Sequence, residues 1–247
     1  MFIAASSRCF SDLRFEDACR QIIDLEFDRI EIWMNESSKH LKPSEVAHEP
    51  DAFRLRLREY GRLTPVAFTF EHDVSPEIMR GVCVAAKILK VTQINIPAGE
   101  LGTPFNAEID RLKEFVRIGN EHGVRIGIHT KTGHLTEDPH TAVELCQSVR
   151  GLGIALDPSY YVCGPHRNQT FDQVFPHVLH MMLRDSTPTE VQVQVGLGEV
   201  DYGKLMSCLE REKYARALSV DFYPDKFGSA SRIQEMRKLR LLLESML

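Results

Sequence analysis

The chain has 247 residues, of which 43% are hydrophobic and 26% charged, and its 35 acidic and 30 basic residues give a net charge of −5. This length fits one large α/β barrel or two small domains, and the hydrophobic content is ample for a packed core. The balanced charge argues against an electrostatic nucleic-acid binder, and no apolar run approaches the roughly 20 residues of a membrane span.

Eight short apolar runs alternate with amphipathic stretches along the whole chain. The runs predict strands at Phe2–Ser6, Arg29–Trp33, Pro65–Phe70, Thr92–Pro97, Val124–Thr130, Gly153–Asp157, Val178–Arg184 and Ala217–Phe222. The stretches between them predict helices at Arg14–Leu25, Asp51–Arg62, Pro76–Leu89, Asn106–His122, Pro139–Val149, Gln169–Phe175, Tyr202–Glu212 and Ser229–Leu247. Such alternation implies parallel strands with right-handed crossovers.

Eight strand–helix pairs are the number of a closed barrel, which favours it over an open, doubly wound sheet. The segment after the first predicted strand, SSRCFS, also lacks the glycine-rich phosphate loop of many open sheets. We therefore predict a single (β/α)8 TIM barrel domain over residues 1–247. The loops that follow the downstream ends of the strands are longer than those at the upstream ends; they are Asn35–Glu49, Thr130–Asp138 and Ser159–Asn168. We therefore expect the functional site on the downstream face of the barrel.

The cellular compartment is suggested by the first residues and by the cysteines. The start of the chain, MFIAASSRCF, lacks the basic segment and long apolar core of a signal peptide. The six cysteines lie far apart without a CxxC pair, which predicts reduced and mostly buried thiols. We expect a cytoplasmic protein with no membrane attachment.

Polar residues stand at the downstream ends of several predicted strands, where such a barrel carries its active site. His129, Asp157 and Asp221 end three of these strands, and one imidazole with two carboxylates could hold zinc or manganese. Met182 has the equivalent place on the seventh strand, and hard cations avoid a thioether. Two structural alternatives stay open: His129 could simply hydrogen-bond a carboxylate, and Asp157 could cap a turn.

Other polar residues share the inward strand faces or the loops that follow them. We expect substrate contacts from Glu31, Asn95, Lys131, Tyr160, Arg184 and Glu199. The cationic side chains among them, Lys131 and Arg184, could neutralise the carboxylates in place of a metal ion. Alternatives remain: Glu31 could be a satisfied buried acid, Arg184 could pair with Asp185 outside the barrel, and Glu199 could favour a helix N-terminus.

The motifs, taken in order, resemble the xylose-isomerase-like barrel superfamily of sugar isomerases, keto-sugar epimerases, inosose dehydratases and type IV apurinic endonucleases. The resemblance covers the whole length and rests on RIEIW, INIP, GIHT, IALDPS, HMMLRD, VGLGEVDY and LSVDF. Members typically bind one divalent cation through Glu, Asp, His and Glu on the last four strands, and the glutamates move the substrate proton. Here these positions are His129, Asp157, Met182 and Asp221, so the resemblance implies an altered metal site.

The resemblance implies a sugar or polyol isomerase or epimerase that acts on a small carbohydrate-like ligand. His129, Asp157 and Asp221 would be its catalytic residues and would ligate a zinc or manganese ion that is weakly bound or absent. A homo-oligomer is compatible with the sequence. One alternative is a non-catalytic, ligand-binding barrel. The other, an endonuclease-like phosphodiesterase, is disfavoured because Tyr160 and Met182 stand where metal-binding histidines are usual.

Overall fold

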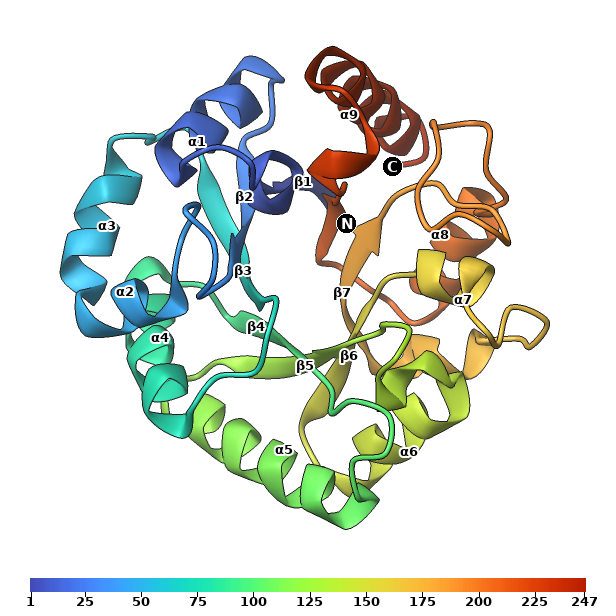
Figure 1. The fold of residues 1–247 in the computed structure, drawn as a ribbon, viewed down its shortest axis with the longest axis horizontal. Helices are drawn as coiled ribbons and strands as arrows, with labels where there is room; N and C mark the ends of the chain where they lie inside the picture. Colours follow the sequence, from blue (N-terminus) through green and yellow to red (C-terminus); the bar gives the residue numbers. More distant parts are fainter.

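The computed structural model describes residues 1–247 and contains a closed barrel of eight parallel strands in sequence order (Figure 1). The strands are β1 (Phe2–Ser6), β2 (Arg29–Met34), β3 (Thr64–Phe70), β4 (Gln93–Pro97), β5 (Arg125–His129), β6 (Leu152–Leu156), β7 (Val178–Leu183) and β8 (Ala217–Val220). Strand β1 pairs with both β2 and β8, which closes the sheet. The predicted (β/α)8 architecture is confirmed.

Helices surround the barrel and return the chain to the start of each next strand (Figure 1). They are α1 (Phe15–Asp24), α2 (Pro43–His48), α3 (Pro50–Arg58), α4 (Pro76–Leu89), α5 (Phe105–Glu121), α6 (Pro139–Ser148), α7 (Ser159–Cys163), α8 (Tyr202–Arg211) and α9 (Ser229–Glu244). Short 3-10 turns complete the set: η1 (Ser7–Phe10), η2 (Leu135–Glu137), η3 (Asp172–His177) and η4 (Pro224–Lys226).

Three segments differ from the sequence-based expectation. The expected loops at 35–49 and 159–168 contain the short helices α2 and α7. The helix predicted at Gln169–Phe175 is instead the 3-10 turn η3, which includes Pro176. Proline lacks the backbone N–H that an α-helix uses, so a regular helix does not form here.

The strands bury an apolar outer face against the helices and an unusually polar inner face. Ile30 and Ile32 on β2 are fully buried in the hydrophobic core, whereas Glu31 between them points into the barrel and is equally buried. Successive side chains of a strand point to opposite faces of the sheet, so apolar and polar residues that alternate in sequence separate onto the outer and inner faces. Because buried polar groups need partners, the barrel interior must supply hydrogen bonds to such side chains.

No helix has the combination of length and apolar character that crossing a bilayer requires. All six cysteines are free, and five of them are buried. The burial agrees with the prediction of mostly buried thiols.

Candidate active site

Asp157 and Asp221 both reach the carboxyl-terminal mouth of the barrel because each directly follows the last residue of a strand. Strand β6 ends at Leu156 and β8 ends at Val220. Both aspartates are completely buried, so their charges need close partners inside the protein.

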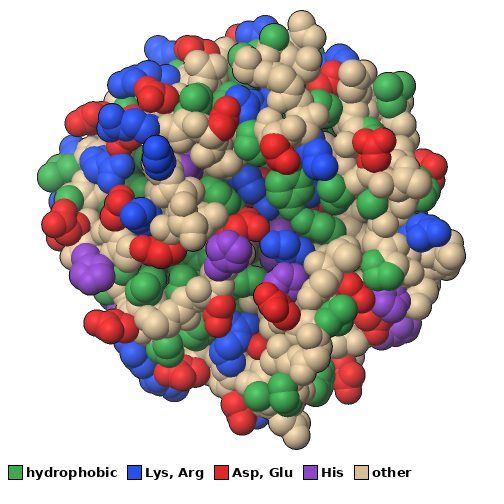
Figure 2. Space-filling model, in the orientation of Figure 1, with side chains coloured by type: hydrophobic (Ala, Val, Ile, Leu, Met, Phe, Trp, Pro, Cys, Tyr) green, Lys and Arg blue, Asp and Glu red, His purple; other side chains and the backbone are tan.

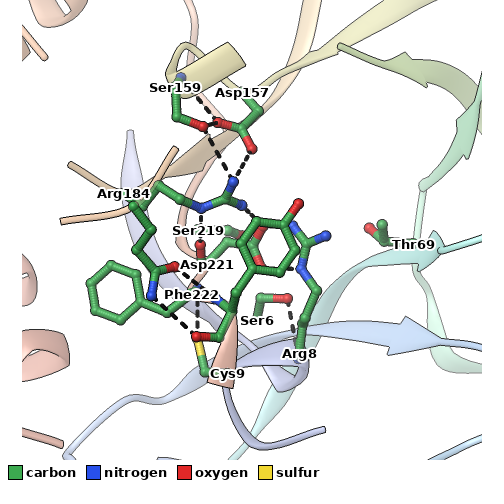
Figure 3. Close-up of polar contacts among 12 residues, drawn as sticks. Ser6, Arg8, Cys9, Thr69, Asp157, Ser159, Arg184, Ser219, Asp221 and Phe222 are labelled. Atoms are coloured by element: carbon green, nitrogen blue, oxygen red, sulfur yellow. Dashed lines mark hydrogen bonds and ion pairs between the residues drawn. The ribbon is translucent and has the colours of Figure 1, made fainter. Parts of the chain in front are cut away.

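One guanidinium joins the two carboxylates (Figure 3). Arg184 follows β7, and its Nη1 and Nη2 lie 2.7 Å from Oδ2 of Asp157 and 2.7 Å from Oδ2 of Asp221, respectively. Its Nε donates to the backbone carbonyl of Asp221 at 2.7 Å, and Nη1 donates to Oγ of Ser159 at 3.2 Å. The Arg184 side chain is 0% exposed, so all of these contacts lie inside the protein.

A second guanidinium, from Arg8, reaches Asp221 as well (Figure 3). Arg8 lies in η1, just after β1; its Nε donates to Oδ1 of Asp221 at 2.8 Å, and its Nη2 donates to Oδ2. Its Nη1 lies 3.5 Å from Oε2 of Glu71. Sequence analysis did not select Arg8, although its place two residues after a predicted strand is the signal that could have found it.

The two arginines determine the charge state of both aspartates. Burial opposes ionisation of Asp221, but the charges of Arg8 and Arg184 outweigh it and bring the pKa of Asp221 far below its usual range. For Asp157, burial is likewise outweighed, mainly by Arg184, and the pKa is lowered. Both carboxylates therefore stay ionised at neutral pH and are weak proton acceptors.

His129, the last residue of β5, is the basic group that the arginines leave free. Its Nε2 is buried, lies 3.7 Å from Oδ2 of Asp157, beyond hydrogen-bonding distance, and has no hydrogen-bond partner. Burial lowers the pKa of His129 below its ordinary value, so the imidazole is neutral at neutral pH. The ring of Tyr160 lies edge-on beside it, 6.0 Å between centroids. A neutral imidazole with a free nitrogen can act as a general base.

Glu71 and Lys131 form the more open side of the mouth. Oε1 of Glu71 accepts a hydrogen bond from Nζ of Lys131 at 2.9 Å, and its Oε2 accepts one from the Trp33 indole at 3.0 Å. Burial opposes ionisation of Glu71, but Arg8 and Lys131 lower its pKa to about 2. The side chains of Lys131 and Glu71 are 24% and 18% exposed, so a ligand can reach them.

Two tyrosines cover the arginine pair. The hydroxyls of Tyr160 and Tyr223 are hydrogen-bonded to each other. The centroid of the Tyr223 ring lies 4.6 Å from the Arg8 guanidinium carbon and 4.4 Å from that of Arg184, as cation–π contacts require. Burial raises the pKa of Tyr160, so its hydroxyl keeps its proton at neutral pH.

Glu31 and Asn95 lie deeper, in a hydrogen-bonded network inside the barrel. Oε2 of Glu31 is 2.7 Å from Nε2 of His180, and Oγ1 of Thr69 donates to Oε1 of Glu31 at 2.8 Å. Asn95 donates to the same threonine oxygen at 3.0 Å. Oγ of Ser219 also meets Nε2 of His180, at 3.0 Å. In a catalytic triad the serine and the acid bind opposite ring nitrogens, so this network is not one.

Asp185 shapes the loop after β7 and does not pair with Arg184. Its Oδ2 accepts hydrogen bonds from the backbone of Gly196 at 2.8 Å and Gly198 at 3.1 Å. A Cβ on Gly198 would overlap the Asp185 carboxylate, which accounts for this glycine in the GLGE run. Glu199 is exposed and lines a separate cavity of about 110 Å³ beside α7 and α8, so the structure does not bring it to the mouth.

A cavity of about 360 Å³ adjoins Glu71. Most of its lining residues are polar or charged and come from the segments that follow β3, β4 and β5, with Glu71, His72, Glu100, Thr103, Arg111 and His134 among them. In Figure 2, acidic, basic and histidine side chains gather around the centre of the visible face. The volume is in the range of small-molecule sites, and a polar lining suits a ligand rich in hydroxyl groups.

A family model described as a xylose isomerase-like TIM barrel matches residues 19–244. The chain belongs to this family. No curated protein matches the sequence significantly.

Solved structures of xylose isomerase-like barrels and sugar epimerases share the fold at low sequence identity. A D-tagatose 3-epimerase-like protein is 17% identical with a TM-score of 0.75, over 99% of this chain and 97% of its own. A xylose isomerase-like TIM barrel protein from Mycobacterium smegmatis, in complex with magnesium, is 16% identical with a TM-score of 0.74, over 97% and 95%. A D-allulose 3-epimerase from Methylomonas sp., in complex with D-allulose, is 13% identical with a TM-score of 0.68, over 96% of each chain.

The divalent cation common in the xylose isomerase-like family does not fit the residues of this mouth. No group of three or more His, Cys, Asp or Glu side chains is arranged to hold a metal ion. The carboxylates of Asp157 and Asp221 are bridged by Arg184, and a dication between them would meet strong repulsion from the guanidiniums. The ligand set expected from His129, Asp157 and Asp221 is therefore not formed in this arrangement.

Proposed function

We propose that this barrel binds a neutral sugar or polyol at its carboxyl-terminal mouth and moves one substrate proton without a divalent cation. The proposal rests on the contrast between two ion-paired carboxylates and one unpaired imidazole at the mouth. Arg8 and Arg184 hold Asp157 and Asp221 as ion-paired anions, while His129 keeps an unpaired ring nitrogen.

The charges at the mouth favour a neutral ligand over an anionic one. The cations are Arg8, Arg184 and Lys131, and each is in contact with a carboxylate from Asp157, Asp221 or Glu71. An anionic ligand would find no unpaired cation there, whereas hydroxyl groups can share hydrogen bonds with ion-paired groups. The epimerase relative that holds D-allulose also binds a neutral sugar.

We assign the base to His129 and the polarising contacts to Lys131 and Tyr160. Neutral His129 would take a proton from the carbon next to the substrate carbonyl. The Lys131 ammonium or the Tyr160 hydroxyl would donate a hydrogen bond to the carbonyl oxygen, where negative charge develops. All three guanidinium nitrogens of Arg184 are engaged by protein groups, so in this proposal it positions the two carboxylates and does not touch the ligand.

A single base favours aldose–ketose isomerisation over epimerisation. One group can remove a proton from one carbon and return it to the neighbouring carbon on the same face, while the neighbouring hydroxyl gives its proton to the former carbonyl oxygen. Inverting a carbon requires a second acid–base group on the opposite face, and the low pKa values of Asp157 and Asp221 make both poor candidates.

Proton exchange with D2O tests this function without knowledge of the product. The protein would be treated with EDTA and incubated in D2O with a panel of neutral aldoses and ketoses, and ¹H NMR would follow the signal of the C–H next to the carbonyl. We expect exchange with at least one sugar, unaffected by the chelator. His129→Gln should slow exchange by about 10²-fold or more. His140→Gln, at an exposed position on α6, is the matched control and should behave like wild type.

The second candidate function is a non-catalytic sugar-binding barrel, favoured by the ion pairing of both central carboxylates. It predicts saturable sugar binding by calorimetry with no C–H exchange in any member of the panel. Exchange that the chelator abolishes would contradict the metal-independent proposal.

A further inference from the structure

A second sizeable cavity, of about 400 Å³, lies at the opposite, amino-terminal end of the barrel. The first residues of several strands line it, including Phe2 of β1, Gln93 of β4, Arg125 of β5 and Ala217 of β8. Arg216 and the deeper His180 also contribute, and no aspartate or glutamate is among the lining residues. The walls therefore carry positive charge without a matching acid.

The two arginines of this cavity have no carboxylate partner. Neither Arg125 nor Arg216 forms an ion pair; the polar contact of the Arg216 side chain is to Oε1 of Gln93, at 3.5 Å. Arg29 lies nearby, with its guanidinium carbon 4.1 Å from the centroid of Phe2, but its Nε is 3.8 Å from Oδ1 of Asp28, so its charge is partly balanced. In a chain with a net charge of −5, the unpaired Arg125 and Arg216 make this cavity a local positive site that attracts anions.

The inner end of the cavity is polar and buried. His180 is 2% exposed and Gln93 is 3% exposed. Glu31 and Ser219 both use Nε2 of His180, and Nδ1 has no hydrogen-bond partner in the protein. Because Nε2 donates its proton to the Glu31 carboxylate, Nδ1 of the neutral ring is an acceptor, and it can receive a hydrogen bond from a hydroxyl group on the organic part of a ligand.

We propose that this cavity binds the phosphate group of a small organic phosphate, with Arg125 and Arg216 as the principal anchors. The planar guanidinium fork matches phosphate oxygens, and two forks supply the charge that a dianion needs. The cavity is larger than a free phosphate fills, and Val66 and Ala215 offer apolar wall for the organic part. A five-residue strand such as β4 separates the two ends of the barrel by about 15 Å, so this site is independent of the proposed sugar site.

Calorimetric titration at low salt tests the site with two probes, inorganic phosphate and glycerol 3-phosphate, and with glycerol as the neutral comparison. The double variant Arg125→Gln/Arg216→Gln should weaken binding of the monoester by at least about tenfold. Arg237→Gln removes an exposed arginine of α9 that forms no ion pair, and it should leave the affinity unchanged. The pair Arg125→Lys/Arg216→Lys keeps the charge but loses the fork, and should show an intermediate affinity.

Each outcome decides the proposal. Tighter binding of glycerol 3-phosphate than of inorganic phosphate, lost in the double Gln variant, supports an organic phosphate as the ligand. Equal binding of both probes, lost in the same variant, supports the anion site with free phosphate as its ligand. No binding by wild type at millimolar concentrations, or equal affinity in the double Gln variant with its fold confirmed by circular dichroism, overturns the proposal.

Discussion

Arg184 contacts Asp221 twice, through the side-chain carboxylate and through the backbone carbonyl, both at 2.7 Å. The two contacts orient the guanidinium so that its remaining nitrogen, Nη1, meets Asp157. Three buried charges are thus satisfied by one rigid arrangement at the ends of β6, β7 and β8. The mouth of this barrel carries a side-chain cation between its two central carboxylates.

Arg184→Met should destabilise the protein and open the mouth to metal ions. Removing one partner of a buried ion pair typically costs about 3–5 kcal/mol of unfolding free energy. Asp157 and His129 would then be free to ligate zinc or manganese, while Asp221 would still be paired with Arg8. Thermal melting and elemental analysis after incubation with metal would measure the two effects.

The control for this prediction is Arg232→Met, which removes another buried arginine whose partner, Asp12, lies away from the mouth. It should lose stability without gaining metal. An Arg184→Met protein with an unchanged melting temperature and unchanged metal content would exclude the proposed role of Arg184.

Asp221 should make the protein sensitive to acid. A carboxylate with a lowered folded-state pKa contributes stability above its unfolded pKa of about 3.9, and this contribution is lost as the pH falls towards the folded value. The unfolding free energy should therefore fall below about pH 4 in the wild type. Asp221→Asn should be about 3–5 kcal/mol less stable at neutral pH and should show a flatter acid dependence.

Urea unfolding at a series of pH values between neutrality and pH 3 measures this dependence. Glu121→Gln removes an exposed partner of Arg117 and should change stability by less than about 1 kcal/mol. Equal acid dependence in wild type and Asp221→Asn would show that Asp221 titrates alike in the folded and unfolded chains.

The rate of C–H exchange should depend on the ionisation of His129. Burial lowers the pKa of this imidazole, so the basic form dominates at and above the ordinary histidine value of about 6.5. We expect a rate that is flat at neutral pH and falls about tenfold per pH unit below the lowered pKa. A rate that instead rises steadily above neutral pH would point to a base other than His129.

Gly198→Ala should disturb the loop after β7, because the added Cβ would overlap the carboxylate of Asp185. Overpacking of this kind typically costs about 1–3 kcal/mol. Gly203→Ala, inside α8 and with its nearest neighbour 3.5 Å from the added carbon, should be neutral or slightly stabilising. Urea unfolding of both variants measures the difference; equal stabilities would show that the loop relaxes around the new methyl group.

The sequence by itself determined the architecture and the place of the candidate site. Apolar runs alternating with amphipathic stretches predicted all eight strands, because the strands of a parallel barrel are buried on both faces and read as apolar. His129, Asp157 and Asp221 were predicted at the carboxyl-terminal mouth because each stands at the downstream end of a strand, and the structure places them there. These features follow from local periodicity, which a single sequence contains.

Only the tertiary structure decided which charges pair. Arg8 and Asp221 are separated by 213 positions in the sequence, yet they form a buried ion pair because β1 and β8 are neighbours in the closed barrel. Sequence also left open whether Arg184 would turn outward to Asp185 or inward to Asp157 and Asp221. Ion pairing depends on distance and burial in space, and both are established only when the barrel closes.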